Sequence, residues 1–480
     1  MIKDDVLVVG AGPTGLTLAL FLKKAGLRPR IIDKNAGPGQ ASRALGVQGR
    51  TLEFYGQLGI ADEVIGKGIQ MESIHLRRRG REVTQVRLAD FGHGLSPYPF
   101  VLSFPQDEHE KLLIEHLQAA GISIEWETEL LEIRSSTSEV QASLRTRGGM
   151  EEQRVAAYVV GCDGARSVVR RSLNLNFAGG TYDKTYFVAD VEAKGEAAAG
   201  HSFSLCLGSQ GVLLVLPVRT TGMHRLIGVV PQEVSGDKHL TFENIREYVE
   251  KEALIRIQRV NWFSTYQAHH RVAEHFQVGR VFLAGDAGHI HSPVGGQGMN
   301  TGIGDSVNLA WKLAAVLQGR AAVSLLDTYE PERIAFAHTL VATTDKLFAL
   351  MTGSGVGPKL FRSTIVPRLA PRALKVPRVR LGAFRRISQI GIHYRDSLLS
   401  DTKGRGVHGL RGGDRLPWVR TVDGADNFLP LRTLEWQAHV YGKVSPELQL
   451  FAQHLAHNSP WQPRSVGRRS LVYRSDGRRA

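Results

Sequence analysis

The chain has 480 residues, 42% of them hydrophobic, so it is long enough to bury a large core in two or three domains. Its only cysteines, Cys162 and Cys206, exclude a disulfide framework and a cysteine-rich zinc site, and we expect ordinary buried thiols. The net charge of +14 is not interleaved with aromatic residues, which argues against a nucleic-acid partner. A solvated basic surface is the default interpretation, and attraction of anionic substrates or of a membrane surface is the alternative.

The apolar run 6–22 contains glycines, Pro13 and Thr14, and it lacks a basic leader and a small-residue cleavage site. These features argue against a membrane span and a signal peptide. No other stretch looks long and apolar enough to cross a bilayer. We therefore expect a soluble, cytoplasmic protein with no transmembrane segment.

Residues 5–33 have the order strand, glycine turn, helix, strand, acid. The run Val6–Val9 predicts a strand buried on both faces, a helical apolar spacing continues to Gly26, and the next strand ends at Asp33. Between the first strand and the helix lie three glycines, Gly10, Gly12 and Gly15. This complete unit is the dinucleotide-binding fingerprint.

Each part of the fingerprint has a physical reason. Gly10 allows the tight turn, Gly12 has no side chain to keep a pyrophosphate from the backbone, and Gly15 lets the helix pack closely on the strand. The free N–H groups of the helix face the phosphates, and Asp33 can accept hydrogen bonds from ribose hydroxyls. The alternative is a glycine-rich turn that binds nothing.

The remaining elements follow in chain order from periodicity and turn residues. In the first half of the chain we predict a helical stretch from 40 to 59, antiparallel strands of another domain at 69–104, a helix at 106–120 and strands at 122–160. One antiparallel sheet follows at 187–231, then helices at 242–253 and 300–317 and further helices to about 350. The chain continues with a proline-rich basic connection at 367–386 and a small unit at 406–477, which contains a strand at 436–440 and a helix at 446–455.

Two further motifs stand at predicted strand ends. Asp163 and Gly164, in VGCDGARSVVR, form either an ordinary Asx-type turn or a turn that offers amides and a carboxylate to a ligand. Asp286 precedes SPVGGQGMNTG, whose glycines let the backbone approach a flat ligand before a helix begins near Asn300. The alternative for this second stretch is a flexible glycine loop.

Together these motifs resemble the class A flavoprotein monooxygenases, the aromatic-ring hydroxylases similar to p-hydroxybenzoate hydroxylase and phenol hydroxylase. The resemblance rests on GAGPTG at 10–15, CDGARSVVR at 162–170 and AGDAGHIHSPVGGQGMNTGIGDSVNLAWKL at 284–313. Residues 409–417 and 471–477 look like parts of the thioredoxin-like tail of the phenol hydroxylase branch. Because this tail has no CxxC, we expect it to be structural.

The resemblance implies an α/β chain: a Rossmann-like FAD-binding fold with an inserted antiparallel-sheet substrate domain and a short thioredoxin-like C-terminal unit. We expect the FAD-binding domain at 1–68, 105–178 and 268–350, the substrate-binding sheet domain at 69–104 and 179–267, a helical connection at 351–400, and the C-terminal unit at 401–480.

The resemblance also assigns cofactor-binding roles and implies FAD as cofactor. Pyrophosphate, ribose, ribityl and ring contacts are expected from Gly10, Gly12, Pro13, Thr14, Gly15, Asp33, Lys34, Arg43, Gln106, Leu130, Asp163, Asp286, Pro293, Gly298, Met299 and Asn300. Leu130 would reach the adenine through its backbone. No metal site is expected, because the spacing of His289 and His291 provides no third ligand.

The family chemistry is hydroxylation of an aromatic, phenolic or polyketide-like substrate with NAD(P)H and O₂, through a flavin C4a-hydroperoxide. A flavin oxidase, a halogenase and a non-catalytic flavin- or ligand-binding protein remain alternatives, although the WxWxIP motif expected of a halogenase is absent. The substrate, the choice of NADH or NADPH, and a monomeric or homodimeric state stay open. The acid/base residue is unassigned; candidates by type alone are Tyr98, Tyr186, Tyr266, His93, His201 and His289.

Overall fold

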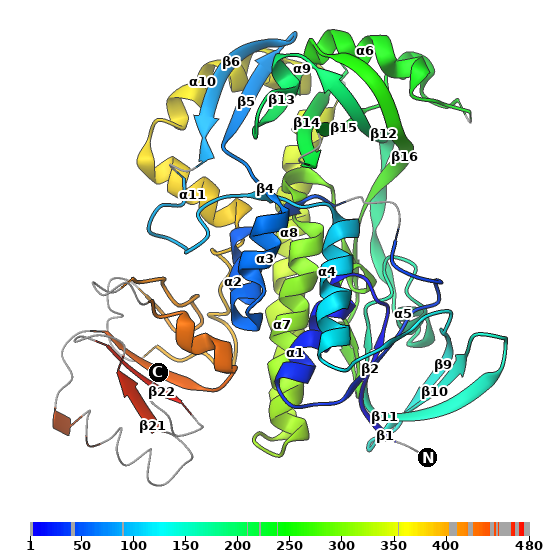
Figure 1. Cartoon of the computed structure of the whole chain (residues 1–480), viewed down its shortest axis with the longest axis vertical. Coiled ribbons are helices and arrows are strands. Elements are labelled where there is room, and N and C mark those ends of the chain that lie inside the picture. The colour runs from blue at the N-terminus through cyan, green and yellow to red at the C-terminus, as the bar shows by residue number, and fades with distance from the viewer. Residues whose placement is uncertain are drawn as a thin grey trace.

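The computed structural model describes residues 3–39, 44–88, 91–208, 210–219, 222–237, 239–353, 355–402, 410–420, 426–441, 446–447, 450, 462–465 and 470–474. Two eight-stranded sheets form the body of the molecule, and helices lie between and beside them (Figure 1). A separate three-stranded sheet lies near the C-terminus.

The first sheet is mixed and has the order β17-β18-β11-β1-β2-β8, with β10 and β9 extending it from β11. β1 lies in its interior, parallel to both β11 and β2, because the run Val6–Val9 has no polar side chain to solvate. Its strands are β1 (Lys3–Val9), β2 (Pro29–Ile32), β8 (Ile124–Glu125), β9 (Glu129–Ser135), β10 (Val140–Arg145), β11 (Glu151–Gly161), β17 (Gln277–Val278) and β18 (Val281–Leu283).

Three helices pack together at the centre of the molecule beside the first sheet: α1 (Pro13–Lys24), α4 (Gln106–Ala119) and α7 (Gly298–Leu317). The helix predicted at 106–120 is confirmed, and its apolar side chains Leu112, Leu113 and Leu117 are all buried. The mixed α/β architecture expected from the sequence is therefore present.

The second sheet has the order β19-β16-β12-β15-β14-β13-β5-β6. Its neighbours are antiparallel except β13 and β5, which are parallel. Helix α6 (Glu243–Ala253) covers one face through Ile245 and Val249. The strands are β5 (Ser73–Arg78), β6 (Arg81–Arg87), β12 (Phe177–Lys194), β13 (Phe203–Leu207), β14 (Val212–Arg219), β15 (Met223–Val229), β16 (Arg256–Ala273) and β19 (His289–Ile290).

The predicted helix from residue 40 is wrong at its start. Residues Gly46–Val47 form β3, which pairs with β7 (Leu102–Ser103), and β7 also pairs with β4 (Ile69–Gln70). Helix α2 begins only at Gly49 and ends at Leu58, before α3 (Ala61–Lys67). Pairing with a strand more than fifty residues away overrides the local helical pattern here.

The segment expected as a proline-rich connection is helical. After α8 (Tyr329–Thr352) follow α9 (Val356–Leu360), a π-helical turn (Phe361–Ile365), α10 (Val366–Ala373) and α11 (Pro377–Ile387). Pro367 and Pro377 stand in the first turns of α10 and α11, where a missing N–H costs nothing.

One helical stretch among the described residues, Val323–Thr352, is apolar and long enough to cross a membrane by length and composition alone, with a mean hydropathy of 1.2. The expectation that no such stretch exists fails on that test. A single such helix is weak evidence for a span, and Phe348 of this stretch packs into an aromatic cluster of the second sheet.

The C-terminal strands β20 (Gln437–Tyr441), β21 (Gln462–Ser465) and β22 (Ser470–Arg474) form the three-stranded sheet, in the order β20-β22-β21. The strand expected at 436–440 is confirmed, with both of its bounds shifted by one residue. Most of the helix expected at 446–455 lies outside the described residues. Contacts that join this region to the body of the molecule include a hydrogen bond from Arg415 Nε to Glu53 at 2.9 Å, one from Arg320 to Glu435 at 2.8 Å, and the rings of Trp436 and Trp311, which lie 5.4 Å apart.

Candidate cofactor site

The first glycine motif forms a turn that only glycines tolerate. Gly10 has a φ of +108°, and a Cβ on it would lie 2.4 Å from the carbonyl oxygen of Cys162. A Cβ on Gly15 would lie 1.9 Å from the Gly10 oxygen, whereas a Cβ on Gly12 would meet nothing within 4 Å. Gly10 and Gly15 are therefore required by packing, and Gly12 faces open space that a ligand can occupy.

Helix α1 presents its unpaired amides to this space. Its N-cap is Gly12, no side chain caps it, and no acidic residue lies in its first turn. Asp33, at the end of β2, accepts hydrogen bonds from the Ala11 N–H at 2.8 Å and from the Asn35 N–H at 2.9 Å. Its carboxylate therefore fixes the turn and stands at its rim.

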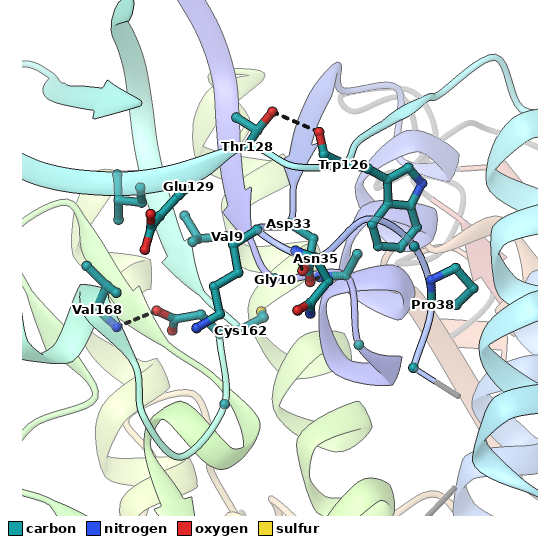
Figure 2. A pocket seen from close by; sticks show the side chains of 18 of the residues that line it. Val9, Gly10, Asp33, Asn35, Pro38, Trp126, Thr128, Glu129, Cys162 and Val168 are labelled. Atoms are coloured by element: carbon teal, nitrogen blue, oxygen red, sulfur yellow. Dashed lines mark hydrogen bonds between the residues drawn. The ribbon is translucent and has the colours of Figure 1, made fainter. Parts of the chain in front are cut away.

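A cavity of about 250 Å³ opens beside this turn. Six predicted residues line it: Gly10, Gly12, Asp33, Lys34, Leu130 and Asp163. Figure 2 shows Trp126 and Pro38 at one end of the cavity and Glu129 and Val168 at the other. Sequence reasoning missed Trp126 and Glu110, which line the cavity and belong to no motif, and Arg166, which lies in the second motif but was given no role.

Asp163 caps helix α5 (Val168–Ser172) and keeps one oxygen for a ligand. Its Oδ2 accepts from the backbone N–H groups of Val168 at 2.6 Å and Val169 at 3.2 Å. Its Oδ1 is buried and has no hydrogen-bond partner, and burial raises the pKa of this carboxyl. A buried acceptor of this kind fits a hydroxyl donor such as those of the ribose or ribityl chain of FAD.

The second and third motifs contact each other through Arg170. Its guanidinium stacks on Phe177, donates to the Ala165 carbonyl at 2.8 Å, and donates to the Ala287 carbonyl at 2.7 Å. Ala287 belongs to the turn that carries Asp286, so Arg170 fixes that turn against α5. Asp286 itself is exposed and does not line the cavity.

The first and third motifs interlock at Thr14. A Cβ on Gly285 would lie 2.6 Å from Thr14 Oγ1, and a Cβ on Gly302 would lie 2.4 Å from the same atom. The Thr14 side chain therefore fills the contact between the strand-end turn and α7. Ser306 Oγ adds a hydrogen bond to the Thr14 carbonyl at 2.7 Å.

The glycine loop leads into α7 with uncapped amides. Gly295 and Gly296 have φ of +76° and +60°, and Pro293, just before them, is exposed. Helix α7 has no capping side chain and no acid in its first turn, so the N–H groups that begin at Gly298 and Met299 are available to a negatively charged group.

The side chain of Asn300 binds protein, not solvent. Its Oδ1 accepts from the Gln48 N–H at 2.9 Å and from Thr51 Oγ1 at 2.7 Å. Its Nδ2 donates to the carbonyls of Gly46 and Gly296, both at 2.9 Å. Asn300 thus joins the glycine loop to the segment between β3 and α2, and only its backbone remains for a cofactor.

A buried charge cluster holds the base of the loop. Asp305 accepts from the Gly285 N–H at 2.9 Å, from His289 Nε2 at 2.8 Å and from Arg333 Nε at 2.6 Å. Arg333 also donates to the Tyr394 hydroxyl at 2.8 Å. The Arg333 and His289 charges hold the pKa of Asp305 below its usual value despite its burial. Asp305 and Arg333 were not predicted.

Three buried polar atoms near the glycine loop have no hydrogen-bond partner: Gln48 Oε1, His289 Nδ1 and His291 Nε2. Gln48 is fixed by its Nε2, which donates to the Gly295 carbonyl at 3.0 Å. Burial lowers the pKa of His291 to about 4, so its ring is neutral at neutral pH. Unsatisfied groups of this kind are costly, and their clustering fits a polar ligand at the loop.

The other predicted site residues are placed less directly. Gln106 accepts from the Ala44 N–H at 3.2 Å and donates to Glu110 at 2.8 Å, so its side chain fixes the segment that follows residue 43. Arg43 lies outside the described residues. Leu130 is buried in β9, and Pro13 occupies the first turn of α1.

The candidate acid/base residues separate into three groups. In the first group, His93 is exposed, His201 Nδ1 lies 3.8 Å from Glu72 Oε1, and Tyr98 packs on Phe100. His289 is committed to Asp305. Tyr186 and Tyr266 lie in a cluster with Phe348, Val229 and Ala268 on the second sheet.

Tyr182, which sequence reasoning missed, connects this aromatic cluster with the glycine loop. Its ring packs on Phe348 with centroids 4.6 Å apart, its hydroxyl donates to Asp345, and it interacts with Ser292 beside Pro293. Burial and the Asp345 charge raise the pKa of Tyr182. No motif marks this residue, because its partners lie more than a hundred residues away.

Comparison with known proteins agrees with this geometry. Residues 3–344 match a family described as FAD binding domain. The chain is 35% identical over 412 residues to 6-methylpretetramide 4-monooxygenase of Streptomyces rimosus, which covers 85% of this chain and 73% of that protein. It is 30% identical over 415 residues to pentachlorophenol 4-monooxygenase of Sphingobium chlorophenolicum, which covers 86% of this chain and 75% of that protein.

The fold is also similar to solved structures. Aklavinone-11 hydroxylase, in a ternary complex with FAD and aklavinone, has a TM-score of 0.77 and 25% identity over 95% of this chain and 88% of that one. The family match spans well over half of the residues, and the cavity, the open space at Gly12 and the unpartnered Asp163 oxygen suit its cofactor. The chain belongs to this family of FAD-binding proteins and, within it, to the class A flavoprotein aromatic hydroxylases.

Proposed function

We propose that this FAD-dependent monooxygenase hydroxylates a phenol or a polycyclic, polyketide-like aromatic compound, with NAD(P)H as the electron donor and O₂ as the oxygen source. The observation that carries the proposal is the position of an apolar aromatic cluster directly beside the glycine loop. Tyr182 joins the two, because it packs on Phe348 and interacts with Ser292. The names of the relatives, which specify pentachlorophenol, 6-methylpretetramide and aklavinone, support the same substrate class.

Bound FAD would supply the redox chemistry and the activation of O₂. The cavity at Gly12 and Asp163 would hold its adenosine and pyrophosphate part, and the glycine loop would hold its ring. The free amides of α7 would stabilise negative charge on the reduced ring by about 0.3–2 kcal/mol. The apolar wall of Tyr186, Val229 and Phe348 would exclude water from the reacting atoms.

We assign the remaining cofactor contacts by position. Lys34 and Leu130 would line the adenosine end, Asp286 would accept hydrogen bonds from ribityl hydroxyls, and Pro293, Gly298 and Met299 would border the ring. Asn300, Gln106 and Thr14 act as positioning residues whose side chains hold the segments together. Arg43 would contact the pyrophosphate, as the resemblance implies.

We also propose the domain division given by the resemblance. Residues 1–68, 105–178 and 268–350 would hold FAD, residues 69–104 and 179–267 would form an inserted substrate domain, and residues 351–400 would connect them to a thioredoxin-like unit at 401–480. The two large sheets support this division, with two exceptions. β19 falls in the FAD range and pairs with β16 of the second sheet, and β7 falls in the substrate range and pairs with β3 of the FAD range. A cytoplasmic location, where NAD(P)H is available, follows from the proposed reaction.

Purified protein reconstituted with FAD tests the function. NADH and NADPH are each added without oxygen, with and without a panel of phenols and polycyclic aromatics, and the bleaching of the flavin absorbance is followed. We expect faster reduction with a matching aromatic compound, and incorporation of oxygen-18 from ¹⁸O₂ into the product. Protein that binds no FAD contradicts the assignment. If the flavin is reduced but no product contains oxygen-18, the enzyme is a flavin oxidase and not a hydroxylase.

A further inference from the structure

Residues 346–395 carry most of the excess positive charge of the chain. This stretch contains eleven Lys and Arg residues and no Asp or Glu, against a net charge of +14 for all 480 residues. It comprises the end of α8, then α9, the π-helical turn, α10 and α11. Because no acid lies within the stretch, its own side chains cannot neutralise it.

The same stretch exposes large apolar side chains. Among the described residues, it holds eight of the nineteen exposed large hydrophobic residues: Leu347, Leu350, Val356, Leu360, Ile365, Leu369, Val376 and Val379. Isolated exposed apolar side chains are ordinary, but a succession of them along five consecutive helical elements is not. None of these exposed residues is aromatic.

On α10 the cationic and apolar side chains share one face. Ile365, Arg368, Leu369 and Arg372 are spaced i, i+3, i+4 and i+7, which places them along one side of the helix, and all four are exposed. We call this side, together with Lys375 and Val376 that follow it, the basic helical face. Figure 1 shows α10 and α11 beside β6, at the edge of the second sheet.

The stretch is held in place from its inner side. Arg362 is buried and donates to the Gly353 carbonyl at 2.7 Å, which fixes the π-helical turn against the end of α8. Phe384 of α11 is buried against Phe91, and Leu374 packs on the same cluster. The exposed side chains therefore belong to a docked segment whose outer side lacks a partner among the described residues.

We propose that the basic helical face binds an anionic phospholipid surface. Leucine, isoleucine and valine side chains can enter the boundary of the acyl chains while the adjacent arginines reach lipid phosphates. The absence of exposed aromatic residues disfavours a nucleic acid, which uses stacking. Because Phe348 and Arg362 hold the segment on the protein, it lies on the membrane surface without crossing it. The proposal is independent of the proposed function.

Co-sedimentation of the FAD-loaded full-length protein with vesicles tests this inference. The vesicles contain phosphatidylcholine alone or phosphatidylcholine mixed with phosphatidylglycerol. We expect binding to the mixed vesicles only, weakening as salt is raised. The pair R368Q and R372Q should lower the affinity roughly 30-fold, at about fivefold for each cation near an anionic surface. The pair I365S and L369S should also release the protein while leaving its salt dependence unchanged.

Matched controls lie far from this face. The pair K23Q and R28Q removes two exposed cations near the end of α1, and M150S removes an exposed apolar side chain between β10 and β11; both should bind vesicles like the wild type. Flavin absorbance confirms that each variant is folded. Equal binding to both vesicle types, or equal loss in the controls, overturns the proposal. Binding to polyglutamate or to a second copy of the chain, without binding to vesicles, overturns it as well.

Discussion

At the cavity end of the cofactor site, the first strand–turn–helix–strand unit and the loop that follows it provide half of the lining residues, and backbone geometry fixes the turn. At the loop end, buried side chains from separate segments hold a glycine loop that has little structure of its own. Gly10 and Gly15 have no room for a side chain, because a Cβ on either would lie under 3 Å from neighbouring backbone, whereas the loop depends on Asn300, Asp305 and Arg333. The cavity end is therefore specified by residues that are close together in the sequence, and the loop end by polar contacts between distant residues.

The largest effect is expected at the cavity end, from Gly10→Ala. The new Cβ would overlap the Cys162 carbonyl at a φ that disfavours any side chain, so we expect loss of FAD binding by more than about 100-fold and several kcal/mol of stability. Gly12→Ala is the matched control: its Cβ meets no protein atom, so stability should change by less than about 0.5 kcal/mol while FAD affinity falls. Chemical unfolding of the apoprotein and titration with FAD measure both. Equal stability losses would contradict a ligand space at Gly12.

The next largest effect is expected at the loop end, from Asp305→Asn. This change leaves the Arg333 guanidinium buried without its counter-charge, which costs about 3–5 kcal/mol. The Gly285 amide also loses part of its acceptor, so the Asp286 turn should loosen and FAD should bind more weakly. Urea unfolding and a double-mutant cycle with Arg333→Met measure the coupling. Additive effects of the two changes would show that the pair does not hold the loop.

A smaller effect is expected for Asn300→Ala. Four hydrogen bonds are lost, and two of their partners, the Gln48 N–H and the Thr51 hydroxyl, remain buried, so we expect about 2–4 kcal/mol of destabilisation in the apoprotein. Asn176→Ala removes one exposed side-chain hydrogen bond and serves as the control, with a change below about 0.5 kcal/mol. If the apoprotein keeps its stability and only FAD affinity falls, Asn300 is a direct cofactor ligand, as the sequence suggested.

The smallest effect is a pH dependence from His291. Burial lowers its pKa from 6.5 to about 4, so the unfolded chain takes up a proton in this range and the folded chain does not. The contribution of His291 to the free energy of unfolding is therefore fully present above about pH 6.5. It falls as the pH drops towards 4, by ~1 kcal/mol near pH 5.5. His291→Gln should remove this part of the slope in thermal unfolding from neutral to acid pH. His109, whose pKa burial lowers to about 3, should keep contributing in that variant.

The sequence predicted the cavity end well because its signals are local. The order of apolar run, glycines and acid specifies β1, α1 and β2 without reference to the rest of the chain, and Asp163 follows a strand in the same way. Helix α7 and its uncapped start were also evident from the glycines that precede it. These elements need only the geometry of neighbouring residues.

The position of the loop end was predicted from the sequence, but the contacts that hold the loop were not. Asn300 was expected to contact the cofactor, and its side chain instead binds Gly46, Gln48 and Thr51, about 250 residues earlier in the chain. Such partners leave no periodic signal. Residues 46–47 were expected in a helix for the same reason: their pairing with β7 is invisible to a local pattern. The roles of Asp305, Arg333 and Tyr182 likewise depend on distant contacts.

The interlocking of Thr14 with Gly285 and Gly302 has a consequence for synthesis on the ribosome. The amino-terminal turn is complete once about thirty residues have emerged, but its packing partners are made almost three hundred residues later. FAD therefore cannot be captured in its final position by a growing chain until α7 and Arg333 have left the exit tunnel. We expect cofactor insertion to be a late event, closely followed by the closing of the molecule around it.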